Sequence, residues 1–347
     1  MLLEQYDWGL DARTLQVLFA LGLGATFGFA AQITRFCLRR AVAGDFQDRG
    51  RAGAVWLTAL ATAIVCFQLA VSAGWVDLAG HRYLDGELPF LAIIFGGLTF
   101  GSGMILARGC ASRLTVLAAT GNLRAVAVLV VFAIVAHATL KGVLSPVRTA
   151  LGSVTADLPF GTISEIPFGS TIASAVVVLT AIFMIYRHRP AITNVALASA
   201  IGLVPVLGWA TTSFLVFDDF DPLVVQSAAF TLPWSDTLFW AIASSAIPAG
   251  FGTGLIGGVL LGSFLSATVR GELKLESFES PTQTLRYTTG AVLMGFGGVL
   301  AGGCTIGAGL SGGATLSIAA LLALVSIIVG AALVSRMVDR EPAFVAA

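Results

Sequence analysis

Two stretches of this sequence, FGSGMILARGC at residues 100–110 and MGFGGVLAGGC at residues 294–304, align without a gap. The matched positions are Gly101 with Gly295, Gly103 with Gly297, Leu106 with Leu300, Ala107 with Ala301, and Gly109-Cys110 with Gly303-Cys304. Glycine-rich membrane helices also resemble one another by chance, because small residues let helices pack closely. The shared Gly-Cys endings favour a true internal repeat.

A second, weaker match pairs GATFGFAAQITRFC at residues 24–37 with GFGTGLIGGVLLGS at residues 250–263. Gly24 and Gly28 then correspond to Gly250 and Gly254, and Ser263 stands opposite Cys37. Each half of the chain would thus contain a glycine-patterned span followed by a Gly-Cys span. We expect one polytopic membrane domain over residues 1–347, with repeat halves at about 14–142 and 238–334 linked by spans at 170–216.

The composition requires contact with lipid. Hydrophobic residues make up 57% of the chain, charged residues only 11%, and the mean hydropathy is +0.92. A soluble domain carries about 25% charged residues. The formal net charge is zero, so nothing indicates a nucleic-acid partner. The first residues, MLLEQYDWGLDAR, lack an early basic cluster and are therefore not a secretory signal peptide.

The apolar stretches predict an all-α integral membrane protein. A helix needs about 20 apolar residues to cross the hydrocarbon core. Nine segments qualify approximately: Thr14–Leu38, Ala52–Ser72, Phe90–Ala107, Leu123–Leu140, Ile172–Tyr186, Ile192–Val216, Leu238–Ala267, Thr288–Gly302 and Ser311–Val334. With nine crossings, Cys110 and Cys304 end spans of opposite direction. That is the arrangement of an inverted repeat with short broken or re-entrant helices, whose substrate site lies near the midplane.

Basic residues predict the orientation, because cytoplasmic loops are enriched in Lys and Arg. One side would hold Arg39, Arg40, Arg49, Arg51, Arg108, Arg124, Arg187, His188, Arg189, Arg270, Lys274, Arg286, Arg336 and Arg340. The other would hold FDDFDP at residues 217–222, which has no Lys or Arg, and the long loop of residues 142–168. We therefore expect the N-terminus outside and the C-terminus in the cytoplasm of a bacterial inner membrane.

The two Gly-Cys elements are candidate anion sites. Each reads as a helix, a break at Gly109-Cys110 or Gly303-Cys304, and a further helical piece. Irregular backbone at membrane depth persists only beside protein or a water-filled cavity. The N–H groups at a helix start, with the helix dipole, attract anions. A neutral thiol there is a weak but polarizable donor that suits a sulfur ligand.

Charged residues near the cysteines are further candidates. Arg108 and Arg113 flank Cys110, and Arg35 lies deep in the span that ends near Cys37. A charge inside a span indicates function by default, whereas Arg39 and Arg40 fit an ordinary positive flank. Cys66 lacks any glycine context and fits simple packing.

His137 and Lys141 lie one helical turn apart near the outer end of their span. They form either an outer basic mouth or an ordinary interfacial pair, in which the lysine extends towards the headgroups. Both interpretations remain open.

Several functions are disfavoured. The chain has no Walker A motif and therefore does not hydrolyse ATP itself. No predicted span carries a central Asp or Glu, so a carboxylate proton relay is disfavoured. None of the four cysteines lies in a CxxC pair, which argues against a zinc knuckle and a thioredoxin-type motif. We expect no cofactor and no resident metal.

At these motifs the chain resembles the YeeE/YedE sulfur-transport family. The resemblance rests on TRFCLRRA at residues 34–41, LARGCASRL at 106–114 and GGCTIGAGLSG at 302–312, and extends over most of the length. It implies a nine-span, inverted-repeat inner-membrane protein that takes up thiosulfate or a related species and is not an enzyme. It also implies that Cys37, Cys110 and Cys304 pass the anion along through S–H contacts.

The resemblance further implies a small cytoplasmic sulfurtransferase-like (TusA-like) partner. This chain ends at Ala347 without such a fused domain, so the partner is expected to be separate. One departure affects the substrate: Arg113 follows Cys110, whereas the element after Cys304 has no positive charge. The expected substrate is therefore thiosulfate or a related small sulfur-containing anion.

Two other classes remain as alternatives. A membrane thiol-redox enzyme would need two cysteines with Cα atoms within about 7 Å. A soft-metal conduit would need Cys and Met ligands. The chain has only five methionines, and they form no cluster, so the metal conduit ranks last.

Overall fold

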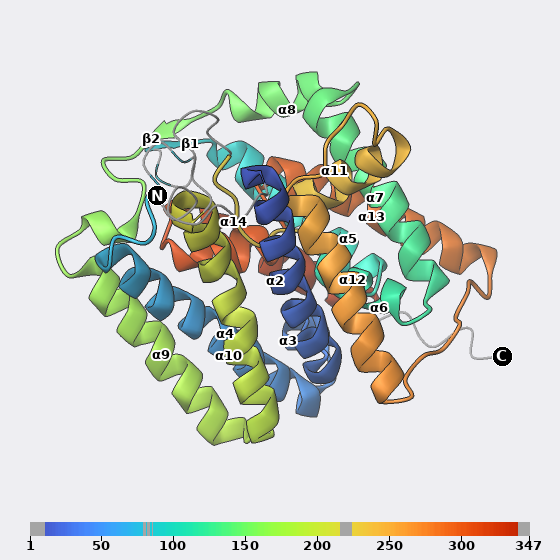
Figure 1. Ribbon diagram of the computed structural model, residues 1–347, viewed down its shortest axis with the longest axis horizontal. Helices are drawn as coiled ribbons and strands as arrows, with labels where there is room; N and C mark the ends of the chain where they lie inside the picture. The colour runs from blue at the N-terminus through green and yellow to red at the C-terminus, as the bar shows by residue number, and fades with distance from the viewer. Residues whose placement is uncertain (1–10, 79–80, 82–83, 85, 216–223, 339–347) are drawn as a thin grey trace.

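The computed structural model describes residues 11–78, 81, 84, 86–215 and 224–338, and these residues form an almost wholly helical protein (Figure 1). The longer helices are α2 (Ala12–Thr34), α4 (Phe46–Ser72), α5 (Phe90–Leu106), α7 (Leu123–Lys141), α9 (Gly169–His188), α10 (Ile192–Ala210), α12 (Phe251–Val269), α13 (Pro281–Leu300) and α14 (Ile318–Val338). The shorter ones are α3 (Leu38–Ala43), α6 (Ala111–Ala119), α8 (Ser145–Gly152), η1 (Ile163–Glu165), η2 (Thr211–Leu215), α11 (Thr231–Ile242) and η3 (Gly307–Gly312).

The only strands in the described residues are β1 (Glu87–Leu88) and β2 (Ala156–Asp157), which pair antiparallel. The predicted all-α membrane architecture is therefore confirmed. Eight of the described helical segments are long and apolar enough to cross a membrane. The helix α13 has 20 residues, but it begins with the polar sequence PTQTLRYTTG and is not among the eight. The count of nine crossings thus stays a prediction.

The predicted span Leu238–Ala267 is wrong in its first part. The chain divides there into α11 and α12, and residues 243–250 between them are not helical. Pro248 lacks a backbone N–H and Gly250 is a poor helix former, so the helix cannot continue through this stretch. Likewise, α14 begins at Ile318 and not at Ser311, because residues 307–312 form the separate π-helix η3.

Helices α2 and α12 are the most closely packed pair, and glycine makes this possible. A Cβ added to Gly254 would lie 2.4 Å from the carbonyl oxygen of Val17, and one added to Gly262 would lie 2.1 Å from that of Ala25. These contacts advance together along both helices, so α2 and α12 run in the same direction (Figure 1). An inverted repeat needs opposite directions, and the weaker alignment of Gly24 and Gly28 with Gly250 and Gly254 is therefore wrong as an inverted pair.

Helices α5 and α13, which end in the two Gly-Cys elements, run in opposite directions. Gly96 approaches the backbone of Ala301, whereas Gly103, further along α5, approaches that of Gly290, earlier in α13. This is the relation that the stronger alignment requires. The inverted repeat as a whole, the single domain and the boundaries of its halves stay predictions.

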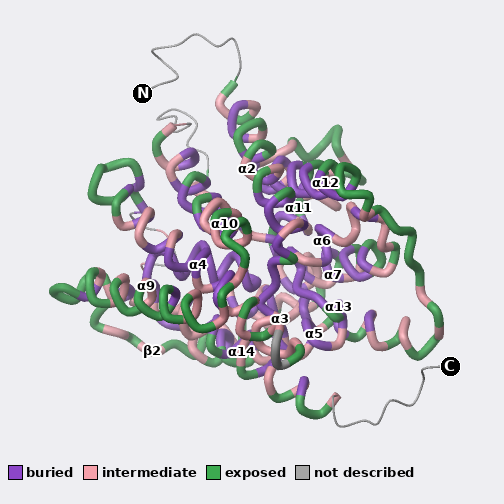
Figure 2. The backbone as a smooth tube through the Cα atoms, turned by 90° about the horizontal axis from the view of Figure 1, so that it is seen from below, coloured by how far each residue is buried: buried purple, intermediate pink, exposed green. Residues whose placement is uncertain are grey.

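The remaining helices surround this central set. Buried residues gather at the centre of the molecule, and α9 lies at its edge with most of its residues exposed (Figure 2). The exposed side chains of α9 include Ile172, Leu179 and Phe183, which are apolar. In a membrane protein, such a face meets lipid.

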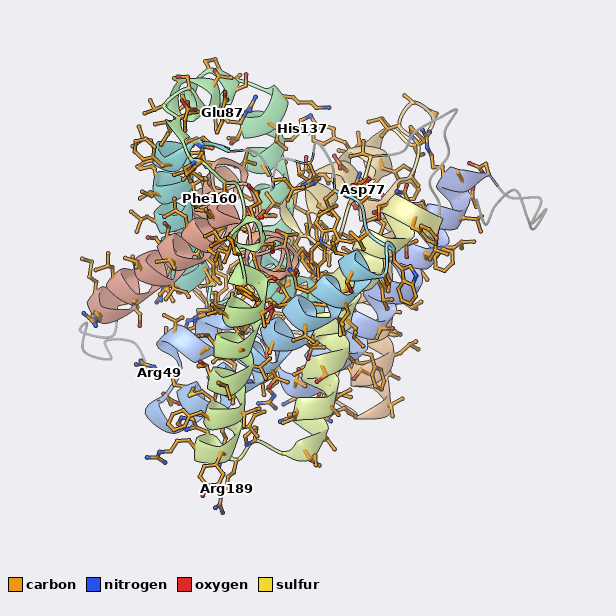
Figure 3. The ribbon with its side chains drawn as sticks, turned by 90° about the vertical axis from the view of Figure 1, so that its left-hand side faces the viewer. Arg49, Asp77, Glu87, His137, Phe160 and Arg189 are labelled. Carbon is orange, nitrogen blue, oxygen red and sulfur yellow. The ribbon has the colours of Figure 1, made fainter. Side chains whose placement is uncertain are left out.

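Charged residues separate along the molecule. Arg49 and Arg189 lie at one end, and Asp77, Glu87 and His137 lie towards the opposite end (Figure 3). Helices α2 and α12 also end at the first end, at the bottom of Figure 1, and their C-caps are Arg35 and Arg270. We call it the arginine-rich end. The predicted acidic segment at residues 217–222, the residues up to Leu10 and Arg340 lie outside the described residues.

Candidate functional site

Three cysteines occupy equivalent places, each just before a short helical piece. Cys37 is the N-cap of α3, and Cys110 is the N-cap of α6. Cys304 begins the turn that leads into η3, with its carbonyl accepting from the N–H of Ala308 at 2.9 Å. The Cys110 carbonyl accepts from Leu114 in the same i to i+4 pattern, also at 2.9 Å. The predicted breaks at Gly109-Cys110 and Gly303-Cys304 are present in the structure.

The same backbone turn precedes each cysteine by two residues. Arg35, Arg108 and Gly302 have φ angles of 51°, 56° and 73°, in the left-handed region. Such a residue commonly ends a helix, and it reverses the chain so that the next helix starts at once. For a non-glycine residue this conformation costs about 1–2 kcal/mol. The chain accepts that cost at Arg35 and Arg108, and each turn leaves a thiol at the beginning of a new helix.

Each cysteine lies next to the backbone N–H groups of its helix start. The N–H of Gly307 donates to the Cys304 sulfur at 3.4 Å. The first turns of α3 and α6 follow Cys37 and Cys110 directly, and their backbone N–H groups are not hydrogen-bonded to these two thiols. These are the amide donors that make a helix N-terminus a site for anions.

Two of the three thiols lie together. The side chains of Cys37 and Cys110 interact with each other, and both residues are buried. The hydroxyl of Ser112 lies 3.2 Å from the Cys110 sulfur. The pair therefore joins the end of α2 to the end of α5. The sequence did not predict this pairing, which connects residues far apart in the chain.

Cys304 is fully buried. A Cβ added to Gly307 would lie 3.9 Å from the Cys304 sulfur and 3.2 Å from the Cβ of Ala229. Gly303 has no room for a side chain, since its Cβ would lie 2.7 Å from the nitrogen of Ala308. At Gly109 an added Cβ would meet only side-chain atoms, the nearest at 3.3 Å on Leu114. Glycine is thus required sterically at 303 and not at 109.

A cavity of about 370 Å³ opens at the arginine-rich end, and two of its lining residues, Arg35 and Arg113, lie close in sequence to Cys37 and Cys110. Its polar lining comprises Gln32, Arg35, Arg113, Thr120, Asn122, Glu272, Lys274 and Glu276. Nη1 of Arg113 is buried and has no hydrogen-bond partner within the described part of the chain. A buried guanidinium N–H without a partner is costly, so a ligand acceptor there would stabilise it. We call this space the inner cavity.

The loop after α12 covers part of the inner cavity. Lys274 and Glu276 donate backbone N–H bonds to the carbonyls of Thr120 and Gly121 at 3.1 and 3.2 Å. Nε2 of Gln32 donates to Glu272 at 2.9 Å. The guanidinium of Arg270 also donates to Glu272, which lowers the pKa of that carboxyl.

A second cavity, of about 360 Å³, borders the element that follows Cys304. Its lining includes His81, Trp209, Ser227, Ala229, Asp236, Gly307 and Ser311. A small space of about 50 Å³ touches Gly302, Gly303 and Gly307 directly and shares Ala229 and Leu232 with the larger one. We call the larger space the outer cavity. The Cys304 element therefore has a cavity close to it, as the thiol pair does.

Not every residue singled out in the sequence reaches these cavities. Arg108 is exposed and lines neither of them. Arg40 binds Asp48 and the carbonyls of Thr34 and Arg35, which is a structural role. Cys66 is partly buried and packs against the core.

At the opposite end of the molecule, His137 contacts α11. Its Nδ1 lies 3.0 Å from the Ser235 hydroxyl, and its ring stacks on Phe239 at a centroid distance of 3.8 Å. His137 is thus tied to a neighbouring helix. The predicted outer mouth of His137 and Lys141 stays a prediction.

Some residues of the site were missed in the sequence. Ser112 lies beside the Cys110 thiol, and its place in the first turn of a helix could have suggested this. Gln32 and Glu272 come from distant segments, and no local pattern connects them. Trp234 of α11 donates to Thr115 of α6 at 2.7 Å, which is again a contact between distant segments.

The family model and the two relatives that match this chain all concern sulfur transport. The family model described as sulphur transport matches residues 33–333. The chain is 26% identical to the thiosulfate transporter TsuA of Escherichia coli (strain K12), over 94% of this chain and 96% of that protein. It is 28% identical to the thiosulfate transporter TsuA of Spirochaeta thermophila, over 89% of this chain and 94% of that protein.

Proposed function

The chain belongs to the sulphur transport family, and we propose that it takes thiosulfate up into the bacterial cytoplasm along a path lined by Cys304, Cys110 and Cys37. The resemblance to the YeeE/YedE family is thereby confirmed. Both relatives are named as transporters, in agreement with the expectation of a transporter and not an enzyme.

The observation that carries the proposal is the threefold repetition of one local structure. A left-handed residue, a thiol two positions later and a helix start occur at all three cysteines. Each copy offers a thiol and backbone N–H groups to an anion. A packing role for the cysteines would not require that three separate thiols share this arrangement.

The two cavities support one order of steps along the proposed path. Thiosulfate enters the outer cavity and reaches Cys304 through the space beside Gly302, Gly303 and Gly307. It then passes to the thiol pair of Cys110 and Cys37 and leaves through the inner cavity. A thiolate would repel the anion, so the thiols act as neutral donors.

Positive charge at the inner cavity favours release towards the cytoplasm. Arg113, Arg35 and Lys274 line this space, and the unpartnered Nη1 of Arg113 is a ready donor for the anion. We propose that the arginine-rich end faces the cytoplasm, with the N-terminus outside and the C-terminus inside. A separate TusA-like sulfurtransferase would then receive the anion at this end.

Uptake of labelled thiosulfate by proteoliposomes that contain only this protein tests the proposal. We expect uptake by the wild type and its loss in Cys110→Ala and Cys304→Ala. The matched control is Cys66→Ala, which should transport normally because Cys66 lies outside the three helix starts. If the folded wild type takes up no thiosulfate even with a TusA-like protein inside the vesicles, the assignment fails.

A further inference from the structure

Three buried phenylalanines form a continuous aromatic cluster. The ring centroids of Phe27 and Phe230 are 5.4 Å apart, and those of Phe27 and Phe36 are 6.3 Å apart with the rings nearly perpendicular. Their exposed fractions are 1% for Phe27, 3% for Phe36 and 0% for Phe230. The cluster joins α2, the turn after it, and the segment before α11.

This cluster connects the surroundings of Cys304 to the pair formed by Cys37 and Cys110. Phe230 directly follows Ala229, which approaches Gly307 beside the Cys304 sulfur. Phe36 directly precedes Cys37, whose thiol contacts Cys110. Phe27 lies between these two phenylalanines. A series of contacts thus connects the Cys304 element to Cys37 through Phe230, Phe27 and Phe36.

We propose that Phe27, with Phe36 and Phe230, is an aromatic barrier that closes the anion path between Cys304 and the thiol pair. The inference rests on the proposed path, and it assigns a function to residues that are not thiols. An anion that leaves one thiol must displace these rings before it reaches the next. Apolar rings offer no charge-assisted hydrogen bond, so a small anion without a thiol partner would pay its full desolvation cost.

The barrier opens through side-chain motion and not through movement of α2. Phe27 lies between Gly24 and Gly28, and both glycines pack directly on the backbone of α12. An added Cβ at Gly24 would lie 2.2 Å from the carbonyl oxygen of Leu255, and one at Gly28 would lie 2.3 Å from that of Val259. This contact holds the Phe27 backbone in place, so only rotation of the rings can clear the path.

Chloride efflux from proteoliposomes tests the barrier without any need for thiosulfate. We expect the wild type to retain chloride and Phe27→Ala to lose it at least about tenfold faster, since a barrier lowered by ~1.4 kcal/mol raises a rate tenfold. Phe230→Ala should show the same leak, and Phe27→Leu, which keeps an apolar side chain, a smaller one. If Phe27→Ala and Phe230→Ala both leak chloride, poor folding of a single variant does not explain the result.

The matched control is Phe132→Ala in α7. Phe132 is fully buried like Phe230, but it belongs to α7 and takes part in neither of the two ring contacts. Retention of chloride by Phe27→Ala and Phe230→Ala, or an equal leak from Phe132→Ala, would overturn the barrier. Thiosulfate uptake measured in the same vesicles reports separately on the proposed function, so the two failures can be told apart.

Discussion

The side chains of Cys37 and Cys110 interact with each other, although one follows α2 and the other follows α5. Each is the N-cap of its own short helix, so two helix starts converge on one point. The amide donors of both helices and both S–H groups can then act on the same anion. Such convergence gives a binding position that neither cysteine provides alone.

Replacement of these two cysteines should therefore be non-additive. We expect Cys37→Ala and Cys110→Ala each to lower thiosulfate uptake by about tenfold or more, the effect of one lost hydrogen bond to a charged group. The double variant should be little worse than either single variant, because residues in contact are coupled. Initial uptake rates of the three variants in proteoliposomes give the coupling. Independent effects that multiply would show that the two thiols serve separate positions.

The contact between the thiols also predicts sensitivity to oxidation. A mild oxidant such as copper phenanthroline should remove two protons and two electrons from Cys37 and Cys110 and join them as a disulfide. Uptake should then fall and recover with dithiothreitol, because the disulfide has no S–H donor. Mass spectrometry of unreduced peptides identifies the bond. The same treatment of Cys37→Ser should yield no cross-link to Cys110, and a dominant cross-link to Cys66 or Cys304 would contradict the observed pairing.

Much of this arrangement was accessible from the sequence, because it depends on local patterns. Composition and the lengths of the apolar segments predicted the membrane helices, and the Gly-Cys endings predicted the breaks before Cys110 and Cys304. The break before Cys37 was not predicted as a separate helix start. Arg35 takes the left-handed conformation there without glycine, so no residue type marked the turn.

Relations between distant segments were not accessible. Residues 24–37 and 250–263 share glycine spacing because α2 and α12 pack against each other through it, and not because they are an inverted pair. A glycine pattern indicates that two helices pack closely, but it does not indicate whether they run in the same or in opposite directions. The Cys37–Cys110 contact and the aromatic cluster likewise depend on how the helices assemble.

Arg113 should contribute to anion binding at the inner cavity. Its Nη1 is buried without a hydrogen-bond partner in the described residues, and Arg113 lines the inner cavity. We expect Arg113→Gln to raise the thiosulfate concentration for half-maximal uptake by about tenfold, the effect of one lost charged hydrogen bond. Arg113→Lys should retain part of the affinity because the charge remains.

The control for Arg113 is Arg124, which also lies near this end. Arg124 is held by Glu276 at 2.6 Å and by Glu279 at 3.7 Å, so its charge is already paired. Arg124→Gln should leave the half-maximal concentration unchanged. Equal changes in both variants would mean that the inner cavity attracts anions only through its overall charge.

The parallel packing of α2 on α12 predicts very different effects for two neighbouring glycines. Gly258 faces α2, and an added Cβ would lie 2.1 Å from the carbonyl oxygen of Leu21, whereas a Cβ on Gly257 would meet nothing within 4 Å. Gly258→Ala must push the two helices apart, at a cost of about 1–3 kcal/mol. Gly257→Ala should be neutral or stabilise α12 by about 0.5–1 kcal/mol, the ordinary preference of a helix for alanine over glycine.

Thermal unfolding of the two purified variants in the same detergent measures this difference. Gly258→Ala should unfold at a lower temperature than the wild type, and Gly257→Ala at an equal or higher one. Because α2 carries Phe27, the displacement in Gly258→Ala should also loosen the aromatic cluster and raise chloride efflux. Equal stability of the two variants would show that α2 and α12 do not meet at Gly258, and the fixed backbone inferred for Phe27 would have to be abandoned.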